Sequence, residues 1–133
     1  MSSFTSRLIL SVTSEGKYWQ LERPFTFHLG SQYSRTYIKV PRLTLTDFAS
    51  IPRFILPFLP WWAKFNKSSP IHDYLYRIKQ VMGKPITRKE ADNIWLEAMF
   101  VDFRNHRSGK LVAYLDYYGV RAFAGLAWYR ETY

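Results

Sequence analysis

Four side chains that can accept, donate or orient a proton lie in two neighbouring motifs in the middle of the chain. His72 and Asp73 are adjacent in SSPIHDYLYRIK, Tyr76 follows His72 by one helical turn, and Asp92 lies in TRKEADNIW. Imidazole is the commonest general base in proteins, and a carboxylate bonded to one ring nitrogen fixes the tautomer in which the other nitrogen accepts a proton. These residue types would support the activation of water for hydrolysis.

The spacing assigns a separate role to each of these residues. His72 would be the base, Asp92 would orient its ring from a facing helix, and Tyr76 would donate its hydroxyl to the same carboxylate. Asp73 points about 100° away from His72 around a helix, so it faces another space, where it can accept a hydrogen bond or a cation. A straight hairpin of two helices would place Asp92 level with Tyr76, about 6 Å from the level of His72. A contact between His72 and Asp92 therefore requires a tilted crossing or an irregular loop.

A structural alternative stands beside this interpretation. A histidine in the first turn of a helix can be a polar residue with no role in catalysis, and Asp73 in the same turn would complement the helix dipole. Convergence of His72, Tyr76 and Asp92 on one point would favour the chemical interpretation, because capping alone requires no convergence.

The helix that carries His72 has recognisable boundary signals. Ser69 is a predicted N-cap, and Pro70 suits the first helical position, where its missing N–H costs nothing. We expect this helix to continue to about Val81 and to end at Gly83.

Two further helices follow in the sequence. Thr87 and Glu90 form the capping box TRKE of the second helix, and the short connection predicts an antiparallel pair with the first. The third, KLVAYLDYYGVRAFAGLAWYRE, follows Gly109 and is almost long enough to span a membrane. Asp116 and Arg121 lie within it, and charges are costly in lipid, so we expect a buried or partly interfacial helix.

The first third of the sequence predicts strands instead. The segments RLILSV, KYWQLE, FTFHLG and TYIKV are short, rich in β-branched and aromatic residues, and separated by turn-forming residues. We therefore expect an α+β fold: a small N-terminal antiparallel sheet or meander, then three helices. One domain would cover residues 1–133, mainly strand over 1–46 and mainly helix over 47–133.

Composition limits the classes of partner. The chain carries 19 Lys and Arg against 10 Asp and Glu, a formal charge of +9, which favours an anionic partner such as an acidic protein or an anionic membrane surface. The basic residues are scattered and no nucleic-acid-binding motif is present, so we do not expect nucleic acid. The absence of cysteine excludes disulfides and thiolate zinc sites. The N-terminal residues lack the features of a signal peptide.

The segment TDFASIPR carries a second set of polar residues. Asp47 and Ser50 can cap the turn that Pro52 begins. The functional alternative is that Asp47, Ser50 and Arg53 line the pocket of His72. Ser50, His72 and Asp92 have the residue types of a serine triad, but the sequence contains no nucleophile elbow.

Two tryptophans stand out in LPFLPWWAKFNK. Trp61 and Trp62 are flanked by apolar residues and lysines. Such a segment can anchor at an anionic membrane surface, form the centre of a protein interface, or pack over the core. We expect at least one of the two rings to be partly exposed, or buried only against another chain.

Several motifs in order resemble an uncharacterised domain family of tailed phages and prophages. They are TLTDFASIPRFI, HDYLY, TRKEADNIWLEAM and GLAWY, which cover about residues 40–130. The resemblance implies a phage or prophage protein, either a virion (tail) component or an accessory protein, located in the virion or the host cytoplasm. Its partners would be other phage or host proteins, and the resemblance leaves any small-molecule substrate unknown.

A second, local pattern is similar to the active site of the sn-2-cleaving secreted phospholipases, especially their small viral and bacterial members. The pattern is His-Asp-x-x-Tyr, followed about twenty residues later by Ala-Asp. The resemblance implies that His72 activates water, Asp92 orients it, Tyr76 supports the network and Asp73 binds calcium. The chain departs from that family in lacking a glycine-rich calcium loop, since PFLPWWAKFNKSSP stands there. The His-Asp pattern that the chain does share implies an alternative function, a small hydrolase that acts on lipid or the cell envelope.

Overall fold

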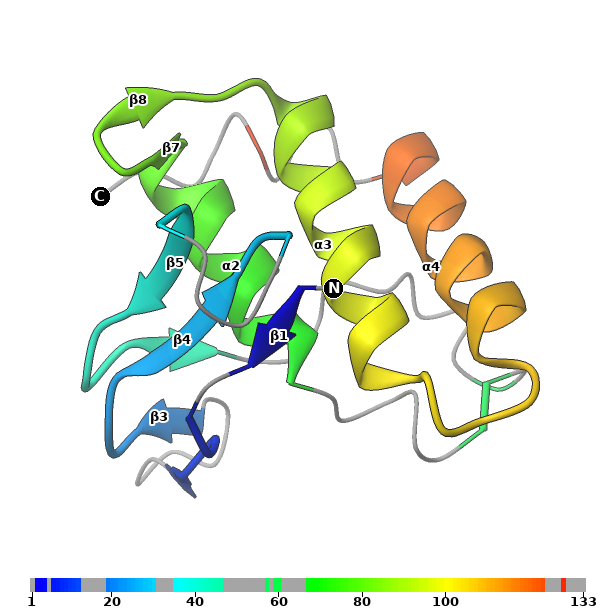
Figure 1. Ribbon diagram of the computed structural model, residues 1–133, viewed down its shortest axis with the longest axis horizontal. Helices are drawn as coiled ribbons and strands as arrows, with labels where there is room; N and C mark the ends of the chain where they lie inside the picture. The colour runs from blue at the N-terminus through cyan, green and yellow to red at the C-terminus, as the bar shows by residue number, and fades with distance from the viewer. Residues whose placement is uncertain are drawn as a thin grey trace.

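A computed structural model describes residues 2–4, 6–12, 19–30, 35–46, 57, 59–60, 67–123 and 128. In this part of the chain, short antiparallel strands come first and three helices follow (Figure 1). The predicted α+β class is confirmed.

The N-terminal strands form two three-stranded antiparallel sheets. The first has the order β1-β4-β5 and the second the order β2-β3-β6. Their bounds are β1 (Ser3–Phe4), β2 (Leu10–Val12), β3 (Trp19–Leu21), β4 (Phe25–His28), β5 (Tyr37–Val40) and β6 (Leu45–Thr46). The four predicted strand segments each contain one of β2 to β5. Strands β1 and β6 were not predicted, because two residues are too few for an alternating pattern.

The hairpin of β4 and β5 supplies the sheet side of the core. Phe25 pairs with Val40 and Phe27 with Ile38, and all four side chains are buried. Alternate residues of a strand point to the same face, so this pairing directs both phenylalanines inward. They belong to one apolar cluster with Leu75 of the first helix.

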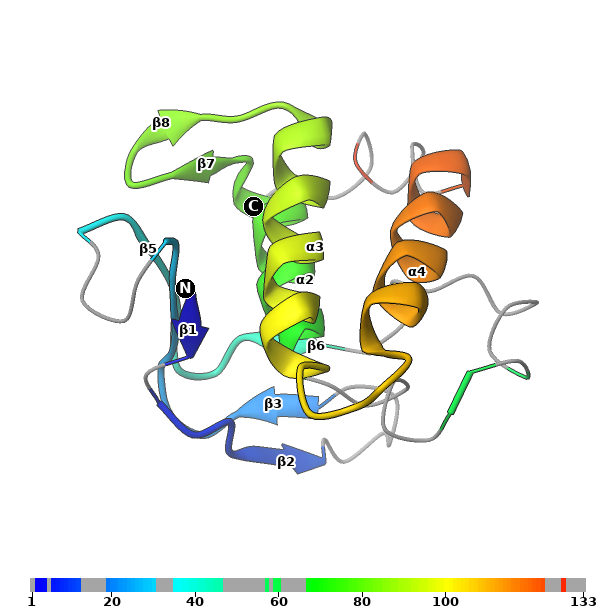
Figure 2. The ribbon, with the colours of Figure 1, turned by 45° about the vertical axis from the view of Figure 1, so that its right-hand side comes forward.

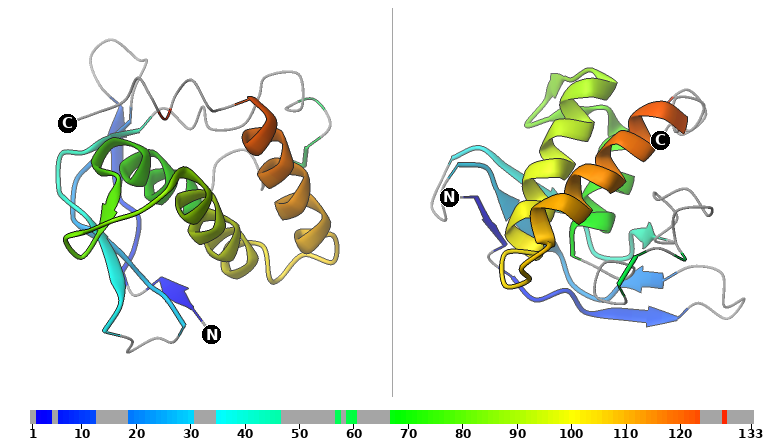
Figure 3. Two further views of the ribbon diagram at one scale, coloured as in Figure 1. Left: turned by 90° about the horizontal axis from the view of Figure 1, so that it is seen from above. Right: turned by 90° about the vertical axis from the view of Figure 1, so that its right-hand side faces the viewer.

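The helices are α2 (Ser68–Ile78), α3 (Arg88–Asp102) and α4 (Gly109–Phe123). Helix α2 packs on α3, and α3 packs on α4. Figures 2 and 3 show α4 on the side of α3 away from the strands. Helices α2 and α3 run antiparallel, as predicted (Figure 1). None of the helices in the described ranges is long and apolar enough to cross a membrane.

The predicted limits of α2 were wrong at both ends. The N-cap is Lys67, without a side-chain capping bond, so Ser69 and Pro70 lie inside the first turn. The helix ends when Lys79 adopts a left-handed conformation with φ 55°. Val81, which we expected in the helix, instead forms the strand pair β7 (Gln80–Val81) and β8 (Lys84–Pro85), with φ 82° at Gly83 in the turn.

The start of α3 follows the local sequence signal. Thr87 accepts a hydrogen bond from the backbone of Glu90, and the Glu90 side chain accepts one from the backbone of Thr87. The predicted capping box is confirmed, and it places Asp92 in the second turn of α3.

The turn between α3 and α4 depends on Gly109. A Cβ atom at this position would lie 2.9 Å from Cβ of Phe103 and even closer to the Phe103 carbonyl oxygen. We expect Gly109→Ala to lower the free energy of unfolding by about 1–3 kcal/mol, the usual cost of overpacking. Urea denaturation measures this, with the exposed neighbour Lys110→Ala as the matched control. Equal losses in the two variants would contradict the steric explanation.

Candidate functional site

The centre of the candidate site is a hydrogen bond between buried side chains of α2 and α3. Nε2 of His72 lies 2.8 Å from Oδ1 of Asp92, and the two side chains are 2% and 0% exposed. Each residue is the fifth of its helix, so both lie in the second turn. The expectation that His72 lies in the first turn was wrong. The predicted contact between His72 and Asp92 is confirmed.

Tyr76 completes the predicted arrangement on α2. Its hydroxyl donates to Oδ1 of Asp92 at 2.6 Å, the same oxygen that contacts His72. The rings of His72 and Tyr76 lie one helical turn apart with centroids 4.3 Å from each other. The expected offset along the helix pair therefore separates neither ring from Asp92, because both reach one oxygen.

Two arginines occupy the other side of Asp92. Nη1 of Arg121, from α4, lies 2.9 Å from Oδ2, and Nε of Arg88 lies 3.9 Å from the same atom. Arg88 also donates to the backbone carbonyls of Val120 and Arg121 at 2.7 and 2.9 Å. The carboxylate of Asp92 thus joins side chains of all three helices.

Sequence analysis did not assign either arginine to the site. Arg121 was noted only as a charge within an apolar helix, which is the one signal that it pairs with a buried acid. Arg88 precedes Asp92 by four residues, so the two share a helix face.

The electrostatics of the network favour a charged Asp92 beside a neutral Tyr76. Burial alone would raise the pKa of Asp92, but the hydrogen bonds from His72, Tyr76 and Arg121 outweigh it and hold that pKa below its ordinary value. Burial, together with the bond to Asp92, raises the pKa of Tyr76. The tyrosine therefore stays protonated and donates to a carboxylate that stays ionised at neutral pH.

Aromatic rings enclose His72. Its ring stacks on Trp95 of α3 with centroids 4.4 Å apart and a 27° angle between the planes.

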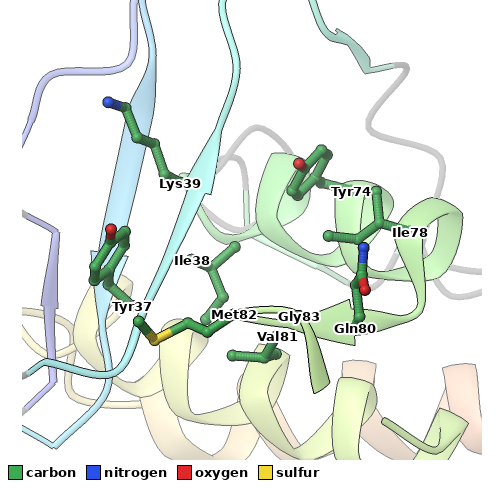
Figure 4. Close-up of a pocket in the computed structure, with 9 residues that line it drawn as sticks. All are labelled: Tyr37, Ile38, Lys39, Tyr74, Ile78, Gln80, Val81, Met82 and Gly83. Carbon is green, nitrogen blue, oxygen red and sulfur yellow. The ribbon is translucent and has the colours of Figure 1, made fainter. Parts of the chain in front are cut away.

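One of the cavities in the described ranges has a volume of about 380 Å³ and lies between β5 and the β7–β8 hairpin. Figure 4 shows its lining, with Tyr37 and Lys39 from β5 and Met82 from the hairpin turn. His72, Tyr76 and Asp92 do not line it.

Asp73 faces a different neighbour, as its position on the helix predicted. Its Oδ2 atom accepts a hydrogen bond from the hydroxyl of Thr46 in β6. The first turn of α2 contains no acidic residue, so the alternative that Asp73 complements the dipole of that turn was wrong.

Asp73 is the residue that the phospholipase resemblance assigned to calcium. Ca²⁺ needs six to eight oxygen ligands. Over the described ranges, no three His, Asp or Glu side chains gather in a way that could hold a metal ion. The described side chains around Asp73 therefore do not supply the ligands that calcium requires.

The remaining predicted site residues cannot be placed. Asp47, Ser50 and Arg53, which we expected to line the pocket, lie outside the described residues. The same is true of the predicted interface residues Trp61 and Trp62.

A buried carboxyl that sequence analysis did not connect to any site lies on α4. Asp116 is 0% exposed, and within the described part of the chain neither of its carboxylate oxygens has a hydrogen-bond partner. Burial raises the pKa of Asp116 to about 7. Among the described residues, Oγ of Ser3 and Nε1 of Trp95 are further buried polar atoms without a partner. The sequence signal for Asp116 was an acid within an apolar helix.

Comparison with known protein families gives a match over most of the chain. A family described as a protein of unknown function (DUF1353) matches residues 19–120, more than two thirds of the chain. No curated protein and no solved structure matches. The match begins well before the motifs of residues 40–130, so it includes the β3–β5 strands.

Proposed function

Because the chain belongs to the DUF1353 family of unknown function, we propose its activity from the site itself: a small ester hydrolase with His72 as general base. The phage-like motifs noted in the sequence support its assignment as an accessory or virion protein of a phage or prophage. The single observation that carries the hydrolase proposal is the placement of Asp92 on Nε2 of His72 at 2.8 Å.

This contact selects the useful tautomer of the imidazole. Asp92 can only accept when ionised, so Nε2 carries the proton and Nδ1 carries the lone pair. Nδ1 would then take a proton from a water molecule as that water attacks the ester carbonyl carbon. The imidazolium formed at His72 would be stabilised by the carboxylate of Asp92, and the proton would pass to the leaving alcohol.

The partners of Asp92 support this role by fixing its position. Tyr76 holds the oxygen that faces His72, and Arg121 holds the other. An orienting group must not rotate away when the neighbouring ring becomes charged.

Burial imposes a requirement on this proposal. The side chain of His72 is 2% exposed, so an ester reaches Nδ1 only if the protein opens around the ring when substrate binds, as many enzymes do. The same burial favours a second candidate function. In this second function, the His72–Asp92 network only holds the three helices together, and the protein is a non-catalytic component of a phage particle or an accessory protein.

Hydrolysis assays separate the two candidates. The purified protein is given anionic phospholipid vesicles or a short-chain soluble ester, with and without calcium, and the released acid is titrated. We expect release by the unmodified protein and a loss of about 10²-fold or more in His72→Gln and in Asp92→Asn, the range for loss of a general base.

The matched control is His106→Gln, which removes an exposed histidine from the α3–α4 turn. It should retain full activity, and circular dichroism checks that each variant is folded. Equal hydrolysis in His72→Gln and in the unmodified protein would reject His72 as base. If no acid is released from either substrate, while His72→Gln is less stable than His106→Gln, the hydrolase is rejected for these substrates and the structural role of the network is supported.

A further inference from the structure

A second cavity lies at the opposite end of α3 from Asp92. Its volume is about 670 Å³, and its lining includes Phe100 and Arg104 from the end of α3 and its turn, and Lys110 and Tyr114 from the start of α4. Pockets for small ligands typically measure about 300–1,000 Å³. This lining includes neither His72 nor Tyr76 nor Asp92, so the cavity is separate from the His72 site.

The lining of the cavity is strongly basic. Arg104, Arg107 and Lys110 contribute three cations, and His106 lies among them. Among the described residues of the lining, Glu97 is the one acid, and its carboxylate accepts a hydrogen bond from Ser2. Three exposed cations thus face one carboxylate that is already hydrogen-bonded.

The start of α4 adds to this positive potential. The N-terminal end of a helix carries a partial positive charge, which acidic side chains usually offset. The first turn of α4 contains no acidic residue, and Lys110 lies within it. An anion bound beside this turn would relieve the repulsion between the helix end and the neighbouring cations.

One wall of the cavity is aromatic. The rings of Phe100 and Tyr114 meet edge to face with centroids 5.4 Å apart, and Tyr114 is 41% exposed. A flat apolar group can pack on such a pair while a charged group is held by the arginines.

From this juxtaposition of cations and rings, we propose that the cavity between the end of α3 and the start of α4 binds a small phosphorylated ligand with a planar ring. The phosphate contacts Arg104, Arg107 and Lys110, and the ring packs against Phe100 and Tyr114. The inference goes beyond the proposed hydrolase, because it concerns other residues and a binding event that does not involve His72.

Calorimetric titration tests the proposal with AMP and phosphotyrosine as probes. Inorganic phosphate and adenosine serve as the parts of AMP, and inorganic phosphate and tyrosine as the parts of phosphotyrosine. We expect at least one of the two probes to bind at least about tenfold more tightly than either part, since a charged contact and a stacked ring both contribute. Arg104→Ala with Arg107→Ala should weaken that binding about tenfold or more. Tyr114→Ala should weaken the binding of the probe but leave the binding of inorganic phosphate unchanged.

The matched control removes two exposed cations elsewhere, Lys84→Ala with Lys89→Ala, and gives the same net charge. Equal weakening by the two double variants would mean attraction by net charge alone and overturn the site. Absence of binding by both probes would overturn it too. Vesicles of phosphatidylglycerol form a further arm: binding to vesicles, without binding of the soluble probes, would identify a membrane surface and overturn a small-ligand site.

Discussion

Replacing Asp92 by alanine should lower the free energy of unfolding by about 3–5 kcal/mol, the usual cost of removing one partner of a buried ion pair. Asp92 is fully buried and binds His72, Tyr76 and Arg121. Its loss leaves two buried polar groups on α2 without an acceptor and leaves Arg121 without its counter-charge. The effect is large because one carboxylate joins three helices.

Urea denaturation at pH 7 measures this loss. The control Lys89→Ala, an exposed residue of the same helix, should change stability by no more than about 0.5 kcal/mol. Asp92→Asn should fall between the two, because the amide oxygen still accepts a hydrogen bond while the charge is absent. A loss below about 1 kcal/mol in Asp92→Ala would show that the network adds little to the stability of the fold.

Asp116 should have the opposite effect when it is replaced. Its carboxyl is buried and has no hydrogen bond within the described ranges, and burial raises its pKa to about 7 from the ordinary 3.8. At pH 8 the folded protein must hold an unpaired buried charge. We expect Asp116→Leu to raise the free energy of unfolding at pH 8 by about 2–4 kcal/mol, because three pKa units correspond to roughly 4 kcal/mol.

The pH dependence of this effect has a defined sign. Between pH 4 and 7 the folded state holds a proton on Asp116 that the unfolded state has lost, so the folded state binds more protons. Stability therefore falls as pH rises through this window and is constant above it. Asp92, whose pKa is lowered, affects stability at lower pH. Its contribution to stability is present above its ordinary pKa and is lost as pH falls through the lowered pKa of the folded state.

Denaturation at pH 4.5, 6 and 8 measures the contribution of Asp116. The unmodified protein should lose stability from pH 4.5 to 8, and Asp116→Leu should lose much less over the same range. The control Asp116→Asn keeps the shape of the side chain but cannot titrate, so it should also lack this pH dependence. An unchanged pH dependence in both variants would mean that Asp116 is not the titrating group.

The sequence predicted the main parts of the site because they depend on local spacing. His72 and Tyr76 share one face of a helix by being four residues apart, whatever the helix packs against. The capping box of Thr87 and Glu90 fixed the start of α3, and therefore the turn on which Asp92 lies. The contact between His72 and Asp92 needed two tertiary assumptions, that the two helices pair and that a tilted crossing or an irregular loop brings the two residues to one level.

The end of α2 was predicted less well, although its signals are also local. Gly83 was interpreted as a helix stop, but it lies in the turn of the β7–β8 hairpin with φ 82°. Glycine permits positive φ in both settings. Pairing of Gln80 with Pro85 and of Val81 with Lys84 decides between them.

The sequence by itself determined the class of the fold, the helix pair and the three residues that meet on it. Only the tertiary structure decided that Arg121 reaches Asp92, that Asp116 is buried with no hydrogen-bond partner among the described residues, and that the ring of His72 stacks on Trp95. The physical reason is the packing of α4 on α3 for the first two, and the packing of α2 on α3 for the third. Arg121 is 29 residues from Asp92 along the chain, and no helical or strand period reports a contact at that separation. Burial of a charged side chain is likewise set by which elements cover it.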